Sequence, residues 1–135
     1  MARILVADDE APMRQLMRLA CERMGHEVHE AMNTQSAIET YERVKPDLLI
    51  LDIHMPGGGG PFVLNALRFG GKRKIGPVLV VTGSLVATAD EVRTGLNVDR
   101  VLPKPSRITD LSAAVRELLA AHPPSEAPPP PPDPA

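Results

Sequence analysis

The chain has 135 residues and a formal net charge of −2, and 8 of its 15 prolines fall within the last 13 positions. We therefore expect one folded domain over residues 1–122 and a proline-rich disordered tail over residues 123–135. The first part is long enough to bury one hydrophobic core, and the tail is too polar and too short to form another.

Charge and cysteine content exclude several classes of protein. Without the tail, 15 basic residues balance 15 acidic ones, so direct binding to nucleic acid is not expected. The basic run from Arg68 to Lys74 is interpreted as a solvated loop. The lone Cys21 excludes an internal disulfide. Because the sequence has no 18-residue apolar run, we expect a cytoplasmic protein without a membrane partner.

Short apolar runs alternate with helical patterns along the chain. Three of these runs are continuous, as is typical of strands buried on both faces of a sheet. The predicted strands are Ile4–Ala7, His26–Ala31 at an edge, Leu48–Leu51, Val78–Val81 and Val98–Leu102. The predicted helices between them are Pro12 to Met24, ended by Gly25, then Ser36–Val44, then Phe62–Phe69, opened by Gly60 and Pro61, and then Leu85–Thr94. A last helix follows with the apolar stripe Ile108, Leu111, Val115, Leu118 and Leu119, and with Thr109 or Asp110 near its N-cap.

Five successive strand–helix units predict an α/β fold. Right-handed crossovers then place the helices on both faces of a parallel sheet. We predict a doubly wound, five-stranded, flavodoxin-like three-layer sandwich with strand order 2-1-3-4-5.

Polar side chains follow four of the predicted strands, at the edge where parallel sheets bind ligands. Singly, each carboxylate could be a helix cap. Together, carboxylates this close would repel one another unless a cation intervened, and clustered oxygen ligands suit Mg²⁺, with Mn²⁺ as an alternative. A lysine and a threonine can bind phosphoryl oxygens, so the set predicts phosphoryl-transfer chemistry. Its members are Asp8, Asp9, Glu10, Asp52, Thr82 and Lys104.

Four segments at these strand ends closely resemble a response-regulator receiver domain of the CheY type. The resemblance extends over residues 3–121. The segments are Ile4-Leu5-Val6-Ala7-Asp8-Asp9-Glu10, Leu51-Asp52-Ile53-His54-Met55-Pro56, Val81-Thr82-Gly83 and Leu102-Pro103-Lys104-Pro105.

The resemblance implies that Asp52 accepts a phosphoryl group from a phosphohistidine on a sensor histidine kinase or a histidine phosphotransfer protein. The phosphorylated chain would then signal to a downstream protein target and dephosphorylate itself slowly. It would thus act as a signalling switch, not as an enzyme. The resemblance leaves open whether it works as a monomer or as a phosphorylation-dependent dimer.

The same resemblance implies roles for the other site residues. Asp9 and Asp52 would bind Mg²⁺ directly, Asp8 would act through a bound water, and the main-chain carbonyl of His54 would complete the protein ligands. Lys104 would pair with Asp52 and then with the phosphoryl group, which the Thr82 hydroxyl would also bind. The Lys104–Pro105 peptide bond is expected to be cis.

Departures from the family pattern concern the readout of phosphorylation. Val101 stands where the family usually has Tyr or Phe, so an aromatic ring that could report on the site is absent. His54 and Ser84 occupy positions that vary and tune phosphoryl lifetime in the family. The run Gly57–Gly60 is either a tolerant loop or, in our hypothesis, a loop whose ordering carries the output.

Two other classes of protein compete with this interpretation. An Asp-nucleophile, Mg²⁺-dependent phosphatase would want a second Asp where His54 stands, and a flavin binder would want a phosphate loop that the sequence lacks. An unphosphorylated receiver-like scaffold is the remaining alternative. Incorporation of phosphate separates the scaffold from the switch.

Overall fold

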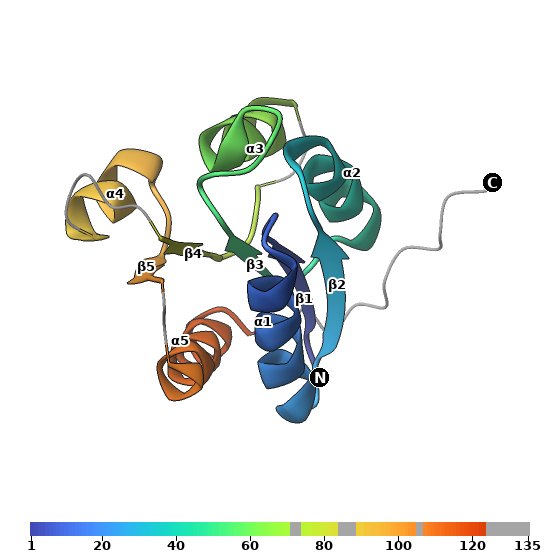
Figure 1. The fold of residues 1–135 in the computed structure, drawn as a ribbon, viewed down its shortest axis with the longest axis vertical. Coiled ribbons are helices and arrows are strands. Elements are labelled where there is room, and N and C mark those ends of the chain that lie inside the picture. Colours follow the sequence, from blue (N-terminus) through green and yellow to red (C-terminus); the bar gives the residue numbers. More distant parts are fainter. Residues whose placement is uncertain (71–73, 84–88, 105–106, 124–135) are drawn as a thin grey trace.

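The structure, a computed structural model, describes residues 1–70, 74–83, 89–104 and 107–123. Strands and helices alternate throughout (Figure 1). In chain order they are β1 (Arg3–Ala7), α1 (Ala11–Arg23), β2 (Glu27–Ala31), α2 (Thr34–Val44), β3 (Leu48–Leu51), α3 (Gly59–Gly70), β4 (Val78–Thr82), α4 (Ala89–Leu96), β5 (Arg100–Pro103) and α5 (Ile108–Ala121).

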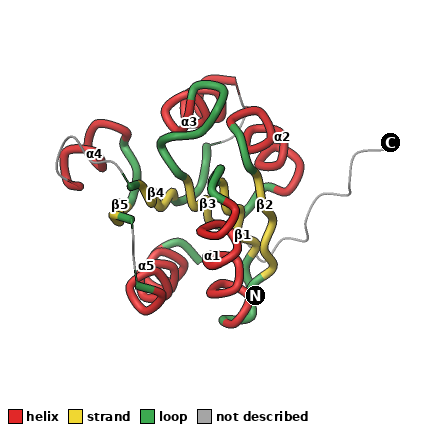
Figure 2. The backbone as a smooth tube through the Cα atoms, viewed as in Figure 1, coloured by secondary structure: helices red, strands yellow, loops and turns green. Residues whose placement is uncertain are grey.

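The five strands form one parallel sheet in the order β2-β1-β3-β4-β5. Helices α1 and α5 cover one face of the sheet, and α2, α3 and α4 cover the other (Figures 1 and 2). This confirms the predicted doubly wound three-layer sandwich and its strand order. The connections from β1 and from β3 lead to opposite sides of the sheet, so the strand order changes direction between these two strands. Sheets of this kind bind ligands at the carboxyl ends of such a strand pair.

Each central strand supplies side chains to two separate cores. In β1, Ile4 and Val6 pack with α1 and α5, while Leu5 and Ala7 pack with α2 and α3. Both faces of the strand are therefore buried, because successive side chains of a strand point to opposite faces. This explains why the apolar runs of the central strands are continuous in the sequence.

Several predicted boundaries near the end of the chain were wrong. α4 extends to Leu96, and the Val98 N–H donates to the Arg93 carbonyl, so β5 begins at Arg100 and not at Val98. The predicted start of α4 at Leu85 lies outside the described residues. The N-cap of α5 is Arg107, without a side-chain cap, so neither Thr109 nor Asp110 caps this helix.

Arg68 ties α3 to the end of α4. Its Nη1 donates to the Leu96 carbonyl and its Nη2 to the Asn97 carbonyl, each at 2.6 Å. These carbonyls belong to the last residue of α4 and to the residue that follows it, where no further helical N–H follows to pair with them. Arg68 therefore caps α4 from a neighbouring helix.

None of the helices in the described part of the chain combines the length and the apolar character needed to cross a lipid bilayer.

His26 gives the fold a pH-sensitive contact between the residue that precedes β1 and the α1–β2 turn. The Ala2 N–H donates to His26 Nδ1 over 3.1 Å, which requires an unprotonated nitrogen. Burial and the charged amino terminus lower the pKa of His26 from 6.5, although Asp47 opposes them. The folded protein therefore binds the His26 proton less readily than the unfolded chain does.

We expect the stability that His26 contributes to be complete above pH 6.5 and to be lost as the pH falls through that value toward the lowered pKa. The loss should be about 1 kcal/mol, the net value of a neutral hydrogen bond. Urea unfolding at pH 7.5 and pH 5.5 measures it. His26→Gln should reduce the difference in the free energy of unfolding between pH 7.5 and pH 5.5. An unchanged difference would assign the pH dependence to other groups.

Candidate functional site

Parallel strand pairing brings the predicted site residues to one edge of the sheet. The hydrogen-bond ladder continues one residue beyond each strand. The Asp8 N–H donates to the Ala31 carbonyl, that of Asp52 to the Ala7 carbonyl, and that of Lys104 to the Thr82 carbonyl, over 3.1, 2.9 and 2.8 Å. The backbone of each site residue is thus fixed by the neighbouring strand, and the side chains start from rigid positions.

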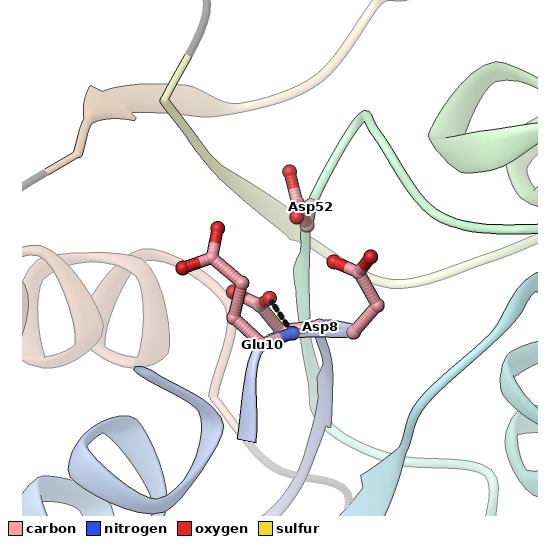
Figure 3. A group of neighbouring side chains, drawn as sticks. Asp8, Glu10 and Asp52 are labelled. Atoms are coloured by element: carbon pink, nitrogen blue, oxygen red, sulfur yellow. Dashed lines mark hydrogen bonds between the residues drawn. The ribbon is translucent and has the colours of Figure 1, made fainter. Parts of the chain in front are cut away.

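Four carboxylates gather at the ends of β1 and β3. Asp8, Asp9, Glu10 and Asp52 each place one carboxylate oxygen within 4.8 Å of those of the others. Figure 3 shows Asp8, Glu10 and Asp52 converging from the two strand ends. Asp8 and Asp52 are 0% and 4% exposed, whereas Asp9 and Glu10 lie in solvent. Two buried negative charges therefore sit beneath two exposed ones.

The ammonium group of Lys104 is the positive charge at the centre of this cluster. Its Nζ lies 2.8 Å from Asp8 Oδ2, 3.2 Å from Asp52 Oδ2 and 3.3 Å from Glu10 Oε1. Burial lowers the pKa of Lys104, but pairing with Asp8 and Asp52 outweighs burial and raises it to about 12. Lys104 is therefore charged throughout the physiological range.

Asp52 is oriented by two donors. The His54 N–H donates to its Oδ1 over 3.2 Å, and Lys104 donates to its Oδ2 over 3.2 Å. Burial raises the pKa of Asp52 above 3.8, and the charge of Asp8 adds to this, while the His54 N–H and Lys104 act against it. The ionised Asp52 carboxylate is thus incompletely compensated, and a further positive charge or hydrogen-bond donor would stabilise it.

Thr82 ends the neighbouring strand β4 and is fully buried. Among the described residues, no hydrogen-bond partner lies within reach of its Oγ1. A buried hydroxyl without a partner is costly, so Thr82 Oγ1 is available to bind a ligand atom that reaches this end of β4. Val101, on β5, is buried in the core shared with α2, α3 and α4.

The loop after Asp52 is built from glycines for a structural reason. Gly57, Gly58 and Gly59 have φ angles of 97°, 113° and 76°, a region that other residues rarely adopt. The Gly59 N–H donates to Thr34 Oγ1 over 2.9 Å, and the Thr34 N–H donates to the Pro56 carbonyl over 3.0 Å. The loop is therefore held against the start of α2. The positive φ angles and these contacts explain why glycines stand here, so the loop is not one that merely tolerates any residue.

The structure brings most of the predicted site residues together but reveals different neighbours for some of them. Lys104 lies closer to Asp8 than to its predicted partner Asp52. The side chain of His54 is exposed, and its contact with Asp52 comes from the main-chain N–H. Ser84 and the Lys104–Pro105 peptide bond lie outside the described residues.

Two contacts of the site were missed by the sequence analysis. Glu10 reaches Lys104, and Arg14 donates from Nη1 to the Asp8 carbonyl over 2.8 Å while its Nε pairs with Glu30. The position of Glu10 directly after two site aspartates was a signal for the first contact. Arg14 carries no such signal, because its spacing is that of any polar residue on α1.

The donor set suits a hard divalent cation. The cluster offers only carboxylate oxygens, and the incompletely compensated Asp52 is the kind of group that a cation stabilises. Asp8, Asp9 and Asp52 therefore fit Mg²⁺.

Two partly open cavities lie elsewhere in the described part of the molecule. A cavity of about 530 Å³ is lined by Arg68, Lys74, Asp99 and His122 among others, and one of about 100 Å³ lies beside Tyr41. Neither is lined by a residue of the acidic cluster. The cluster reaches the molecular surface through Asp9 and Glu10, which are exposed.

Comparisons with known proteins agree with this geometry. A family model described as the response regulator receiver domain matches residues 4–116. The phosphate regulon transcriptional regulatory protein PhoB of Pseudomonas aeruginosa is 35% identical over 129 residues, which cover 93% of this chain and 56% of that protein. The KDP operon transcriptional regulatory protein KdpE of Escherichia coli is 32% identical over 128 residues, covering 95% and 56%. The chain thus spans about half the length of these curated relatives.

Solved structures share the fold. The chemotaxis protein CheY4 of Vibrio cholerae superposes with a TM-score of 0.79 at 24% identity, covering 88% of this chain and 99% of that one. The receiver domain of the Francisella response regulator 1452 gives a TM-score of 0.78 at 24% identity, covering 90% and 98%.

Proposed function

Because the chain belongs to the response-regulator receiver family, whose members are switches of two-component signalling, we propose that Asp52 accepts a phosphoryl group from a phosphohistidine. The donor would be a sensor histidine kinase or a histidine phosphotransfer protein. The observation that carries this proposal is the setting of Asp52, which is a buried and incompletely compensated carboxylate held by Lys104 and the His54 N–H.

The transfer forms one bond and breaks another at phosphorus. An Asp52 carboxylate oxygen bonds to phosphorus as the N–P bond of the phosphohistidine breaks, and the imidazole leaves with the electron pair and takes up a proton. Lys104 can turn an N–H toward the phosphoryl oxygens, and the Thr82 hydroxyl can donate to one of them. Asp9, Asp52 and the His54 carbonyl would hold Mg²⁺ directly and Asp8 would hold it through a bound water, and the ion would neutralise part of the phosphoryl charge.

The remaining roles follow from this proposal. Water reaching the open edge would cleave the acyl phosphate slowly and regenerate the Asp52 carboxylate, so the chain would be a switch with a limited lifetime. His54 and Ser84 would tune that lifetime, and Val101 would alter the readout to a downstream protein target. We place this activity in the cytoplasm, in a receiver domain of residues 1–122 that is followed by a proline-rich tail.

Incubation with acetyl phosphate and Mg²⁺ is expected to add about 80 Da to the intact mass, the mass of one phosphoryl group. The gain should disappear in Asp52→Asn and in the presence of EDTA. Asp110→Asn, at an exposed position in the first turn of α5, is the matched control and should keep it. A folded protein that gains no mass would instead be the scaffold considered above.

A further inference from the structure

Glu10 is the exposed member of the trio of carboxylates around Lys104. An ammonium group has three N–H donors. Lys104 donates hydrogen bonds to Asp52 and Glu10 at 3.2 and 3.3 Å, and it pairs by charge with Asp8 at 2.8 Å without a hydrogen bond to Asp8 Oδ2. The side chains of Asp8 and Asp52 are almost completely buried, whereas that of Glu10 is 64% exposed. Of the three, Glu10 therefore lies on the side from which a phosphoryl group would arrive.

The local backbone aims Glu10 at Lys104 without using its side chain in the fold. Glu10 is the N-cap residue of α1, but its carboxylate makes no cap hydrogen bond. Its main chain is fixed at both ends. Its N–H donates to Asp8 Oδ1 over 2.9 Å (Figure 3), and its carbonyl accepts from the Arg14 N–H over 2.9 Å. The carboxylate is left free to occupy the outer face of the ammonium group.

We propose that Glu10 is a positioning residue that holds one N–H of Lys104 until a phosphoryl oxygen displaces it. This inference rests on the proposed phosphorylation of Asp52. Before transfer, the Glu10 carboxylate stands in for the phosphoryl oxygen. Transfer requires Lys104 to exchange one acceptor for the other, so separating Glu10 from Lys104 adds to the barrier for phosphorylation.

The test compares the rate of phosphorylation of the parent, Glu10→Gln and Glu10→Asp at saturating Mg²⁺. Glutamine keeps the shape and removes the charge. Aspartate keeps the charge but is one methylene too short to keep the contact. Both variants should raise the maximal rate at saturating donor about two- to fivefold, the range of a partly exposed ion pair. Glu39→Gln, at an exposed position on α2, removes the same charge elsewhere and should leave the rate unchanged.

Two donors of different charge separate the contact from a general field effect. Loss of the contact should raise the maximal rate alike with acetyl phosphate and with the less negative phosphoramidate, and 0.5 M salt should leave the increase in place. A purely electrostatic effect at the mouth of the site would instead lower the KM for acetyl phosphate alone and fade in salt. That result, or a Glu10→Asp variant that behaves as the parent does, would overturn the role of Glu10.

The outcomes also distinguish this inference from the proposal beneath it. If the parent and the Glu10 variants gain phosphate at equal rates, the phosphorylation of Asp52 stands and only the positioning role of Glu10 fails. If the parent and all variants gain none, the proposed function fails and the role of Glu10 fails with it.

Discussion

Replacing Lys104 by methionine is expected to lower the free energy of unfolding by about 3 kcal/mol at pH 7, because the change leaves two buried carboxylates without their shared cation. Asp8 and Asp52 are 0% and 4% exposed, and the Lys104 side chain itself is 9% exposed. Urea unfolding in EDTA measures the loss. Lys74→Met, at an exposed position, changes the net charge equally and should cost less than about 0.5 kcal/mol.

The loss should depend on pH in a defined direction. The pKa of Asp52 is already raised above 3.8, and removing Lys104 raises it further. Below pH 3.8 the carboxyl is protonated in both the folded and the unfolded protein, so it costs no free energy of unfolding. The loss of stability grows as the pH rises from that value through the raised pKa. The variant should therefore approach the parent near pH 4. At alkaline pH, the contribution of Lys104 to the parent is complete below 10.5 and is lost as the pH rises toward 12.

Mg²⁺ should restore part of the stability lost in Lys104→Met, since a divalent cation bound by Asp8, Asp9 and Asp52 replaces the missing positive charge. The expected sign is a larger increase in Tm on adding Mg²⁺ for the variant than for the parent. Equal increases in the two proteins would show that the lysine and the cation do not compensate the same carboxylates.

Replacing Gly59 by alanine is the second change with a large expected effect. A Cβ atom at Gly59 would lie 2.2 Å from the Ile53 carbonyl oxygen, and the φ angle of 76° is itself unfavourable for alanine. The Gly59 N–H is also engaged by Thr34, so the loop cannot shift without losing that hydrogen bond. We expect a loss of about 3 kcal/mol or more in urea unfolding, together with slower phosphorylation of Asp52.

Two other glycines provide matched controls for Gly59→Ala. Gly25 has a φ angle of 88° but nothing within 4 Å of an added Cβ, so Gly25→Ala should cost only about 1–2 kcal/mol for the backbone conformation. Gly95 lies within α4 with open space around it, and Gly95→Ala should stabilise the protein by about 0.5–1 kcal/mol. If Gly59→Ala lowers the free energy of unfolding no more than Gly25→Ala does, the loop moves away from Ile53 at little cost in free energy.

The sheet and most of the site could be predicted from the sequence because both are encoded by local patterns. The strand Leu48–Leu51 was predicted with both of its bounds, since four consecutive apolar residues followed by a carboxylate mark a buried strand and its end. Once the strands are parallel, the residues that follow them meet at one edge, so Asp8, Asp52, Thr82 and Lys104 were placed together without coordinates.

Other features depend on contacts that no local pattern encodes. None of the residues of α4 is fully buried, and the end of this helix at Leu96 coincides with the Arg68 contact and the turn at Asn97. The glycines after Asp52 indicate in the sequence that the backbone can adopt unusual conformations there. They do not indicate that the Gly59 N–H binds Thr34. Similarly, the sequence places Glu10 beside the site, but only the turn between β1 and α1 decides that it reaches Lys104.

The Arg68 cap has a consequence for the motion of α4. This helix is eight residues long, buries no side chain fully, and has its last carbonyls satisfied by one guanidinium from α3. Its unfolding would therefore release little apolar surface and break few contacts with the sheet. In hydrogen–deuterium exchange, the amides of α4 should exchange well before those of β1, β3 and β4, through a local opening that leaves the sheet intact. We therefore expect α4 to open separately from the sheet, and the frequency of its opening to depend on the two hydrogen bonds from Arg68.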